Sequence, residues 1–259
     1  MAAASKCERF NGLLVSHDIN EIYEWNRRVC QGQIRRRSPC HSQEHGLPFR
    51  GKFLKRRRRA QSSDKEIKHE IAVLILCEGE ENIVNLNAVH ETRSDTALLL
   101  ELATGGELQT ILDNEECLTE PGRHCMREPQ NILLAGERIE DGLKLCDFGI
   151  SRVVCEGINV REMPAHPTTW PRGAPVQPLS LLTDIWSVGV LTYVLLSGFS
   201  PFGGDTKQET FLNISQCALT FPDNLFGGVS PVAIDFIRRA LRIKPNDRMS
   251  AAGCWNMSG

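Results

Sequence analysis

The sequence predicts an α+β protein built as two unequal lobes. Short apolar runs typical of strands lie in its first half, whereas apolar residues at helical spacing dominate after Thr183. Strand patterns that precede helix patterns in this way are typical of the α+β class. The 259 residues, of which 41% are hydrophobic and 24% charged, are enough to bury a sizeable core.

Residues 1–48 have no steady hydrophobic period, and we expect them to be irregular. Ile19–Glu24 has the composition of a strand start, but the stretch around Arg35–Arg37 follows neither a strand nor a helix pattern. The first clear strand is expected at Lys52–Leu54. The basic run Lys55–Arg59 after it is interpreted as a solvated loop, with contact to a partner or nuclear import as the alternative.

A helix is expected to begin at Ser63 or Asp64. Apolar residues recur at helical spacing from Ile67 to Leu76, and serine is a residue type that caps helix N-termini well. Two further strands are expected after this helix, at Ile83–Leu86 and at Ala97–Leu102.

Three helices are expected in the last third of the chain, at Asp184–Leu196, Lys207–Ser215 and Ser230–Leu241. The run Ile185–Leu196 is the most apolar of the sequence, but it is too short to span a bilayer. The first residues also lack the apolar segment of a signal peptide. We therefore expect no membrane partner.

The charge and the cysteines narrow the class of partner and the compartment. A net charge near −2 gives no general attraction for nucleic acid or for acidic membranes. The ten cysteines include no C-x-x-C pair, so zinc-ligand spacing is absent and reduced, mostly buried thiols are expected. These features favour a cytoplasmic or nuclear protein that does not bind nucleic acid.

Four polar residues occur in an order that suggests phosphate chemistry. Asp147 begins an Asp-Phe-Gly tripeptide after an apolar strand, and Asn131 precedes it in Pro-Gln-Asn-Ile-Leu-Leu. Carboxylate and amide oxygens are the hard ligands that magnesium bound to a triphosphate needs. Upstream, Lys52 on a strand and Glu70 on the next helix are placed to form an ion pair that presents an ammonium to phosphate oxygens. Each piece alone is weak, but the ordered set is specific.

Longer stretches around these residues resemble the death-associated family of Ser/Thr protein kinases, closest to its apoptosis-inducing branch. The resemblance implies a protein-kinase-like two-lobe fold with a truncated N-lobe sheet, at 49–104, and a mainly helical C-lobe, at 105–259. It further implies a monomer that uses ATP and Mg²⁺ and acts on protein hydroxyls. The stretches that carry it are Lys52–Arg59, His69–Leu74, Leu98–Glu107, Pro129–Leu134, Cys146–Arg152, Thr183–Gly198, Ser200–Phe202, Lys207–Ser215 and Lys244–Arg248.

The resemblance assigns the phosphate and metal positions residue by residue. Lys52 resembles the lysine that contacts the α and β phosphates, and Glu70 resembles its helix partner. Asn131 and Asp147 are similar to the two metal-binding residues of the family.

The resemblance also assigns the nucleoside positions. Leu100 looks like the gatekeeper, and Glu101 to Ala103 look like the hinge that hydrogen-bonds adenine. Glu107 matches the position that commonly meets the ribose. Asp184 resembles the buried aspartate that braces the catalytic loop, which is a structural role.

The chain departs from the family pattern in three blocks. No G-x-G-x-x-G precedes Lys52, and the interval Tyr23–Phe49 looks too short for the hairpin that carries this loop. The catalytic-loop segment with its Asp base is missing, as if cut out near 128/129. Residues 163–177 replace the family's peptide-docking segment, so Arg248 lacks the glutamate that normally pairs with it, and we expect it to be unpaired or turned to solvent.

These departures leave three hypotheses open. The first is a Ser/Thr protein kinase relative whose phosphate transfer is impaired, because losing a positioned base typically costs about 10²–10⁴-fold in rate. The second is a non-catalytic pseudokinase that acts by binding a partner through residues 178–254. The third is a chain that does not fold stably, because the missing helix leaves apolar surface on Ile185–Leu196 exposed.

Overall fold

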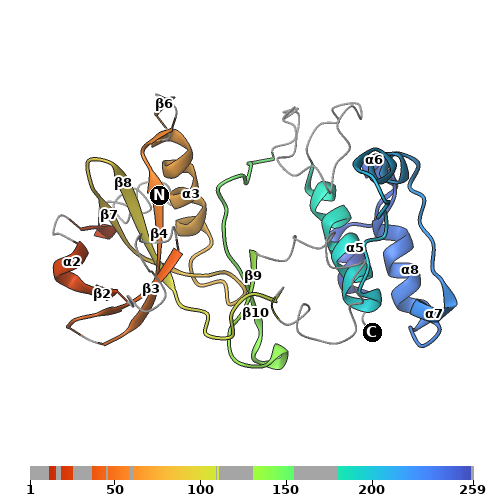
Figure 1. The fold of residues 1–259 in the computed structure, drawn as a ribbon, viewed down its shortest axis with the longest axis horizontal. Coiled ribbons are helices and arrows are strands. Elements are labelled where there is room, and N and C mark those ends of the chain that lie inside the picture. The colour runs from red at the N-terminus through yellow and green to blue at the C-terminus, as the bar shows by residue number, and fades with distance from the viewer. Residues whose placement is uncertain are drawn as a thin grey trace. The chain divides into compact units, whose positions relative to one another are not determined.

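The computed structural model describes residues 12–15, 19–25, 37–44, 46–58, 61–62, 64–108, 110, 131–154 and 180–257. The chain divides into two compact units (Figure 1). The first unit consists of Met1–Leu108 and Asn131–Ser151, and the second of Gln109–Gln130 and Arg152–Gly259. The segment 131–151, which the resemblance places in the C-lobe, thus clusters with the first unit.

A six-stranded sheet forms the first unit, with one helix packed against it. The strands lie in the order β1-β7-β8-β4-β3-β2, and all neighbours are antiparallel except the parallel pair β1 and β7. Helix α3 (Asp64–Leu76) begins where the sequence predicts and buries Ile67, Ile71 and Leu74 in the same cluster as Leu98. The strands are β1 (Leu14–Val15), β2 (Tyr23–Trp25), β3 (Arg37–Ser42), β4 (Pro48–Lys55), β7 (Leu86–Glu91) and β8 (Asp95–Glu101).

The described parts of residues 1–48 differ from the irregular segment that we expected. Strand β2 pairs with β3 and β3 with β4, so the interval between Tyr23 and Phe49 does accommodate two strands. The short helix α2 (Ile19–Ile22) precedes them, and Cys40 of β3 is completely buried in a cluster with Ile19 and Leu99. Pairing to β4 and burial against distant residues stabilise these strands, although their local pattern is weak.

Short ladders complete the first unit. Strands β9 (Ile132–Leu134) and β10 (Leu143–Leu145) form a hairpin around the 3₁₀ helix η4 (Ile139–Asp141). Within the basic run, β5 (Arg57–Arg58) pairs with β6 (Gln61–Ser62), where we expected only a loop. The strand expected at Ile83–Leu86 is displaced, because only Leu86–Glu91 pairs with β8, while Ile83 makes a single bridge to Leu145.

The described part of the second unit is helical, as predicted. Its α5, α6 and α8 coincide with the three expected segments, and Thr206 and Ser230 cap the last two by accepting hydrogen bonds from backbone N–H groups. Trp186, Tyr193 and Ile237 lie in its apolar core. The helices are α5 (Leu181–Ser197), α6 (Lys207–Gln216), α7 (Asp223–Phe226), α8 (Pro231–Ala240), η5 (Pro245–Asp247) and α9 (Ala251–Trp255).

Helix α5 carries apolar side chains in contact with water. Val188, Leu195 and Leu196 are 42%, 44% and 39% exposed. Among the described helices, none is both long and apolar enough to cross a bilayer. The five described cysteines form no disulfide, and of these Cys40 and Cys146 are buried.

Candidate functional site

Lys52, Glu70 and Asp147 come together in the first unit. The Nζ atom of Lys52 lies 2.5 Å from Oε1 of Glu70 and 2.9 Å from Oδ1 of Asp147. Lys52 is 8% exposed and Glu70 3% exposed, whereas the Asp147 side chain retains 29% of its exposure. Three of the four residues that the sequence singled out as one set therefore share one ion-pair cluster.

Local structure explains how each of the three reaches the cluster. Lys52 lies in the middle of β4 opposite Leu98, and Glu70 follows Ile67 on the buried face of α3. Asp147 comes directly after the β9–β10 hairpin and has a φ of 77°. A positive φ is uncommon outside glycine, and such conformations concentrate at functional sites.

The two carboxylates of the cluster hold the ammonium of Lys52 as a fixed positive charge that can bind an anion. A buried carboxylate is costly unless it is paired, so Glu70 and the Lys52 ammonium stabilise one another. Asp147 is the more accessible of the two carboxylates, and a carboxylate is a hard oxygen ligand of the kind that magnesium prefers. The arrangement holds one ammonium and one carboxylate side by side, as a metal-bound phosphate group requires.

Asn131 lies close to Asp147 along the same hairpin. Its backbone carbonyl accepts a 2.9 Å hydrogen bond from the N–H of Cys146, the residue before Asp147, and its side chain is exposed. An amide and a carboxylate supply hard oxygen ligands, so these two residues fit magnesium. Among the described residues, no group of three His, Cys, Asp or Glu side chains is arranged to hold a metal by itself.

The expected nucleoside positions lie at the end of β8 and in the residues after it. Leu100 and Ala103 are each 5% exposed and belong to the core cluster of the first unit. Glu107 lies on a bridge to Leu133 and its carboxylate is 3.8 Å from the guanidinium of Arg50. These residues therefore lie on the chain as it leaves the sheet.

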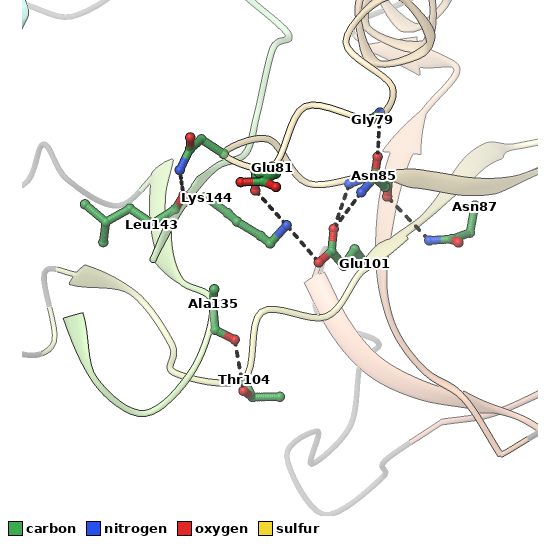
Figure 2. Close-up of polar contacts among 10 residues, drawn as sticks. Gly79, Glu81, Asn85, Asn87, Glu101, Thr104, Ala135, Leu143 and Lys144 are labelled. Carbon is green, nitrogen blue, oxygen red and sulfur yellow. Dashed lines mark hydrogen bonds and ion pairs between the residues drawn. The ribbon is translucent and has the colours of Figure 1, made fainter. Parts of the chain in front are cut away.

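Glu101 has a side-chain role that sequence reasoning missed. Its carboxylate accepts hydrogen bonds from the backbone N–H and the amide of Asn85, and it pairs with Lys144 at 2.9 Å (Figure 2). Lys144 also donates to the carbonyl of Glu81 at 2.9 Å. Desolvation by burial acts to raise the pKa of Glu101, but the hydrogen bonds and the Lys144 charge outweigh it, so its pKa is lowered. The network ties the end of β8 to the start of β7 and to β10.

His69 makes a second contact that sequence reasoning missed. Its Nε2 atom lies 2.9 Å from the carbonyl oxygen of Ser151 and 3.2 Å from its Oγ. The contact joins α3, one residue before Glu70, to the segment after Asp147. The only hint of this contact in the sequence is that His69 lies beside Glu70. That position does not identify Ser151 as the partner of His69.

Arg248 corrects one expectation about the second unit. It is 6% exposed rather than turned to solvent, and its guanidinium donates to the carbonyls of Leu182, Arg242 and Ile243 at 2.8, 2.8 and 3.2 Å. The guanidinium also stacks over the ring of Trp186. Backbone carbonyls and an aromatic face thus compensate the charge where we expected a missing glutamate to leave it unpaired.

Asp184 also differs from its expected state. Asp184 was expected to be buried, but its solvent-accessible area makes it an exposed residue. Partial desolvation of its carboxyl nevertheless raises its pKa. The deletion expected near 128/129, the altered segment expected at 163–177 and the interval 26–36 lie outside the described residues.

Comparison with known proteins identifies relatives over most of the chain. Residues 123–258 match the protein kinase domain. The "Death-associated protein kinase related" protein of Drosophila melanogaster is 74% identical over 270 aligned residues, which cover 95% of this chain and 40% of that protein. "Death-associated protein kinase 2" of Homo sapiens is 33% identical, with 90% of this chain and 70% of that protein covered.

Two further comparisons also match this chain to protein kinases. "Serine/threonine-protein kinase 17A" of Oryctolagus cuniculus is 41% identical over 83% of this chain and 60% of its own length. The solved twitchin kinase region from C. elegans has a TM-score of 0.78 at 26% identity, covering 94% of this chain and 46% of that one. This likeness confirms the kinase-like fold. The chain spans only 40% and 60% of the Drosophila and Oryctolagus relatives.

Proposed function

This chain belongs to the death-associated protein kinase family, and on that basis we propose that it is a Ser/Thr protein kinase-like protein whose phosphate transfer is impaired. The cluster of Lys52, Glu70 and Asp147 carries the proposal, because it joins a buried ammonium to an accessible carboxylate. We place the protein in the cytoplasm or nucleus as a monomer, with ATP and a protein substrate as partners and without nucleic acid or membrane.

Each side chain in the first unit has a defined task in this proposal. Lys52 binds the α and β phosphates, and Glu70 holds its ammonium in place. Asn131 and Asp147 would hold Mg²⁺, which would neutralise phosphate charge, and ATP would be the substrate that supplies the γ-phosphoryl group. Around the nucleoside, Leu100 lines the adenine site, the backbone of Glu101 to Ala103 hydrogen-bonds the base, and Glu107 meets the ribose.

The impairment follows from the missing general base. The alignment with the Drosophila relative has 270 positions, more than the 259 residues of this chain, so that relative has positions that this chain lacks. Without a positioned base, transfer to a hydroxyl is slowed by about 10²–10⁴-fold. Binding of ATP does not need that base, so binding and transfer are separable in this chain.

The test compares binding with transfer on one purified sample. The melting temperature of each protein is measured with and without Mg·ATP. We expect Mg·ATP to raise the melting temperature of the wild type and to leave that of Lys52→Met unchanged. Lys55→Met is the matched control, because Lys55 lies on the same strand but is exposed. Phosphate transfer to a protein substrate is measured in parallel.

Three results decide the proposal. A nucleotide shift that depends on Lys52, with transfer far below that of an intact relative, supports it. Transfer at the rate of an intact relative overturns the impairment. A shift that persists in Lys52→Met overturns the assigned site.

A binding module that acts through the second unit is the alternative function. The described helices of this unit enclose an apolar core of their own, and Arg248 is compensated within it. A cooperative melt without any nucleotide shift, together with capture of a partner by residues 178–254, would favour this alternative.

A further inference from the structure

A pocket in the second unit lies apart from every residue assigned above. It has a volume of about 470 Å³ and lies where the chain leaves α6 and where it leaves α8. The Sγ of Cys217, the residue after α6, donates to the carbonyl of Leu241 at 3.2 Å, which joins the two helix ends. Leu241 is 1% exposed, so the floor of the pocket is part of the core.

The lining of the pocket combines apolar surface with excess positive charge. Arg238, Arg242 and Lys244 line it, and Asp247 supplies the one carboxylate among its described lining residues. Ile243, which is 48% exposed, adds an apolar side chain at the same place. A ligand that fits this lining carries negative charge beside an apolar group.

Positive side chains near helix C-termini commonly serve to cap carbonyl groups. Here other groups donate to four of the carbonyls at or just after the end of α8. Arg248 donates to the carbonyls of Arg242 and Ile243, Met249 N–H donates to that of Arg239, and Cys217 donates to that of Leu241. These four carbonyls therefore do not need the cations of the pocket as caps.

The cations of the pocket are also free to meet a ligand. Within the described part of the chain, the side chains of Arg242 and Lys244 make no hydrogen bond or ion pair, and both residues are exposed. Arg238 lies with its guanidinium 5.0 Å from the ring centre of Phe221, which fixes its position without neutralising it. The charges of Arg242 and Arg248 both act to lower the pKa of Cys217, although desolvation leaves that pKa raised.

From these contacts we infer that this pocket binds an acidic–apolar peptide segment of a partner protein. A carboxylate of the peptide contacts Arg242 and Lys244, and a neighbouring apolar side chain packs on Leu219, Leu241 and Ile243. The inference does not depend on phosphate transfer, because none of these residues belongs to the first unit.

The test uses the full chain and a fluorescent, acetylated peptide of alternating Glu and Leu. Matched peptides carry Gln in place of Glu, or Gly in place of Leu. Fluorescence polarisation is recorded from low to physiological salt, since charge-driven binding weakens as salt rises. Inorganic phosphate is titrated separately as a competitor.

Three variants separate the pocket from general charge. Arg242→Glu is expected to weaken binding of the Glu–Leu peptide about tenfold, because it reverses a charge that faces the peptide. Arg239→Glu makes the same change of net charge in the last turn of α8, three residues before Arg242 and outside the pocket, and is expected to leave affinity unchanged. Asp247→Asn removes the carboxylate of the pocket and is expected to tighten binding about two- to fivefold.

The Asp247→Asn result cannot come from misfolding, because misfolding does not tighten binding. The inference is overturned if the Gln–Leu peptide binds as well as the Glu–Leu peptide, or if Arg239→Glu weakens binding as much as Arg242→Glu. It is also overturned if inorganic phosphate binds in an Arg242-dependent way while no peptide does. That result would make the pocket a phosphate site.

Discussion

At the scale of single residues, three buried charged side chains are compensated in different ways. Lys52 and Glu70 neutralise one another, with Asp147 as a second partner of the lysine. Arg248 instead uses backbone carbonyls and an aromatic ring. Each solution avoids the large cost of leaving a charge buried without a partner.

The Glu101 network makes part of the stability depend on pH. The pKa of Glu101 is lower in the folded chain than its ordinary value of 4.5, so the unfolded chain binds more protons at acid pH. The stabilisation is therefore complete above the unfolded pKa and is lost as pH falls through the folded pKa. We expect Glu101→Gln to lower the free energy of unfolding by about 1 kcal/mol at pH 7 and by less near pH 3.

Urea unfolding from pH 3 to pH 7 measures this difference. Glu80→Gln, at an exposed position, controls for the change in net charge. A gap between wild type and Glu101→Gln that stays constant over this range would contradict the prediction.

Arg248 is expected to be a large contributor to the stability of the second unit. Arg248→Met leaves the carbonyls of Leu182, Arg242 and Ile243 without this donor, and we expect a loss of about 3 kcal/mol in the free energy of unfolding. Arg248→Lys keeps the charge but not the planar set of guanidinium donors, so it should recover less than half of the lost free energy of unfolding. The exposed Arg239→Ala is the control for urea unfolding, and full recovery by lysine would contradict the account.

At the scale of elements, α5 and α8 pack closely through a single glycine. A Cβ built at Gly189 would lie 2.7 Å from Cβ of Ala240 and 3.0 Å from the side chain of Leu241. Figure 1 shows the two helices side by side within the second unit. Glycine in a helix usually lowers stability, so close approach of the helices is the reason for it here.

We therefore expect Gly189→Ala to destabilise the second unit. Overpacking costs about 1–3 kcal/mol, which exceeds the gain of about 1 kcal/mol in helix propensity. Gly228→Ala is the matched control, because a Cβ there meets nothing within 4 Å. Thermal melts followed by circular dichroism measure both variants, and a stabilised Gly189→Ala would show that the helices move apart freely.

At the scale of the whole molecule, the proposed binding cluster and the missing catalytic block belong to different parts of the chain. The cluster of Lys52, Glu70 and Asp147 forms entirely within the first unit. The point of the proposed deletion, between Glu128 and Pro129, falls outside the described residues. Under the proposal, nucleotide binding depends on the cluster in the first unit, whereas phosphate transfer depends on the block that is proposed to be missing.

Restoring the block should restore transfer. We expect insertion of the family's catalytic-loop segment between Glu128 and Pro129 to raise the phosphate-transfer rate by about 10²–10⁴-fold. The same insertion with Asn in place of its catalytic Asp is the control and should return the rate to the starting level. No increase, while the Mg·ATP shift is retained, would place the defect in the replaced segment 163–177 instead.

Helices and motif residues could be predicted from the sequence, whereas several contacts could not. The helical spacing of apolar residues located α3, α5, α6 and α8, because such a pattern is local. The sequence also predicted the ion pair between Lys52 and Glu70, which the structure contains. The strands β2 and β3 were missed, since their pairing and burial depend on residues far away in the chain.

The sequence by itself determined the family, the helical last third and members of the ion-pair cluster. Only the tertiary structure decided how the charge of Arg248 is compensated and which groups bind the carboxylate of Glu101. It also decided that Arg238, Arg242 and Lys244 line one pocket with Leu241. The physical reason is that residue types are visible in the chain, but the donors and acceptors that satisfy a buried charge come from segments brought together only by folding.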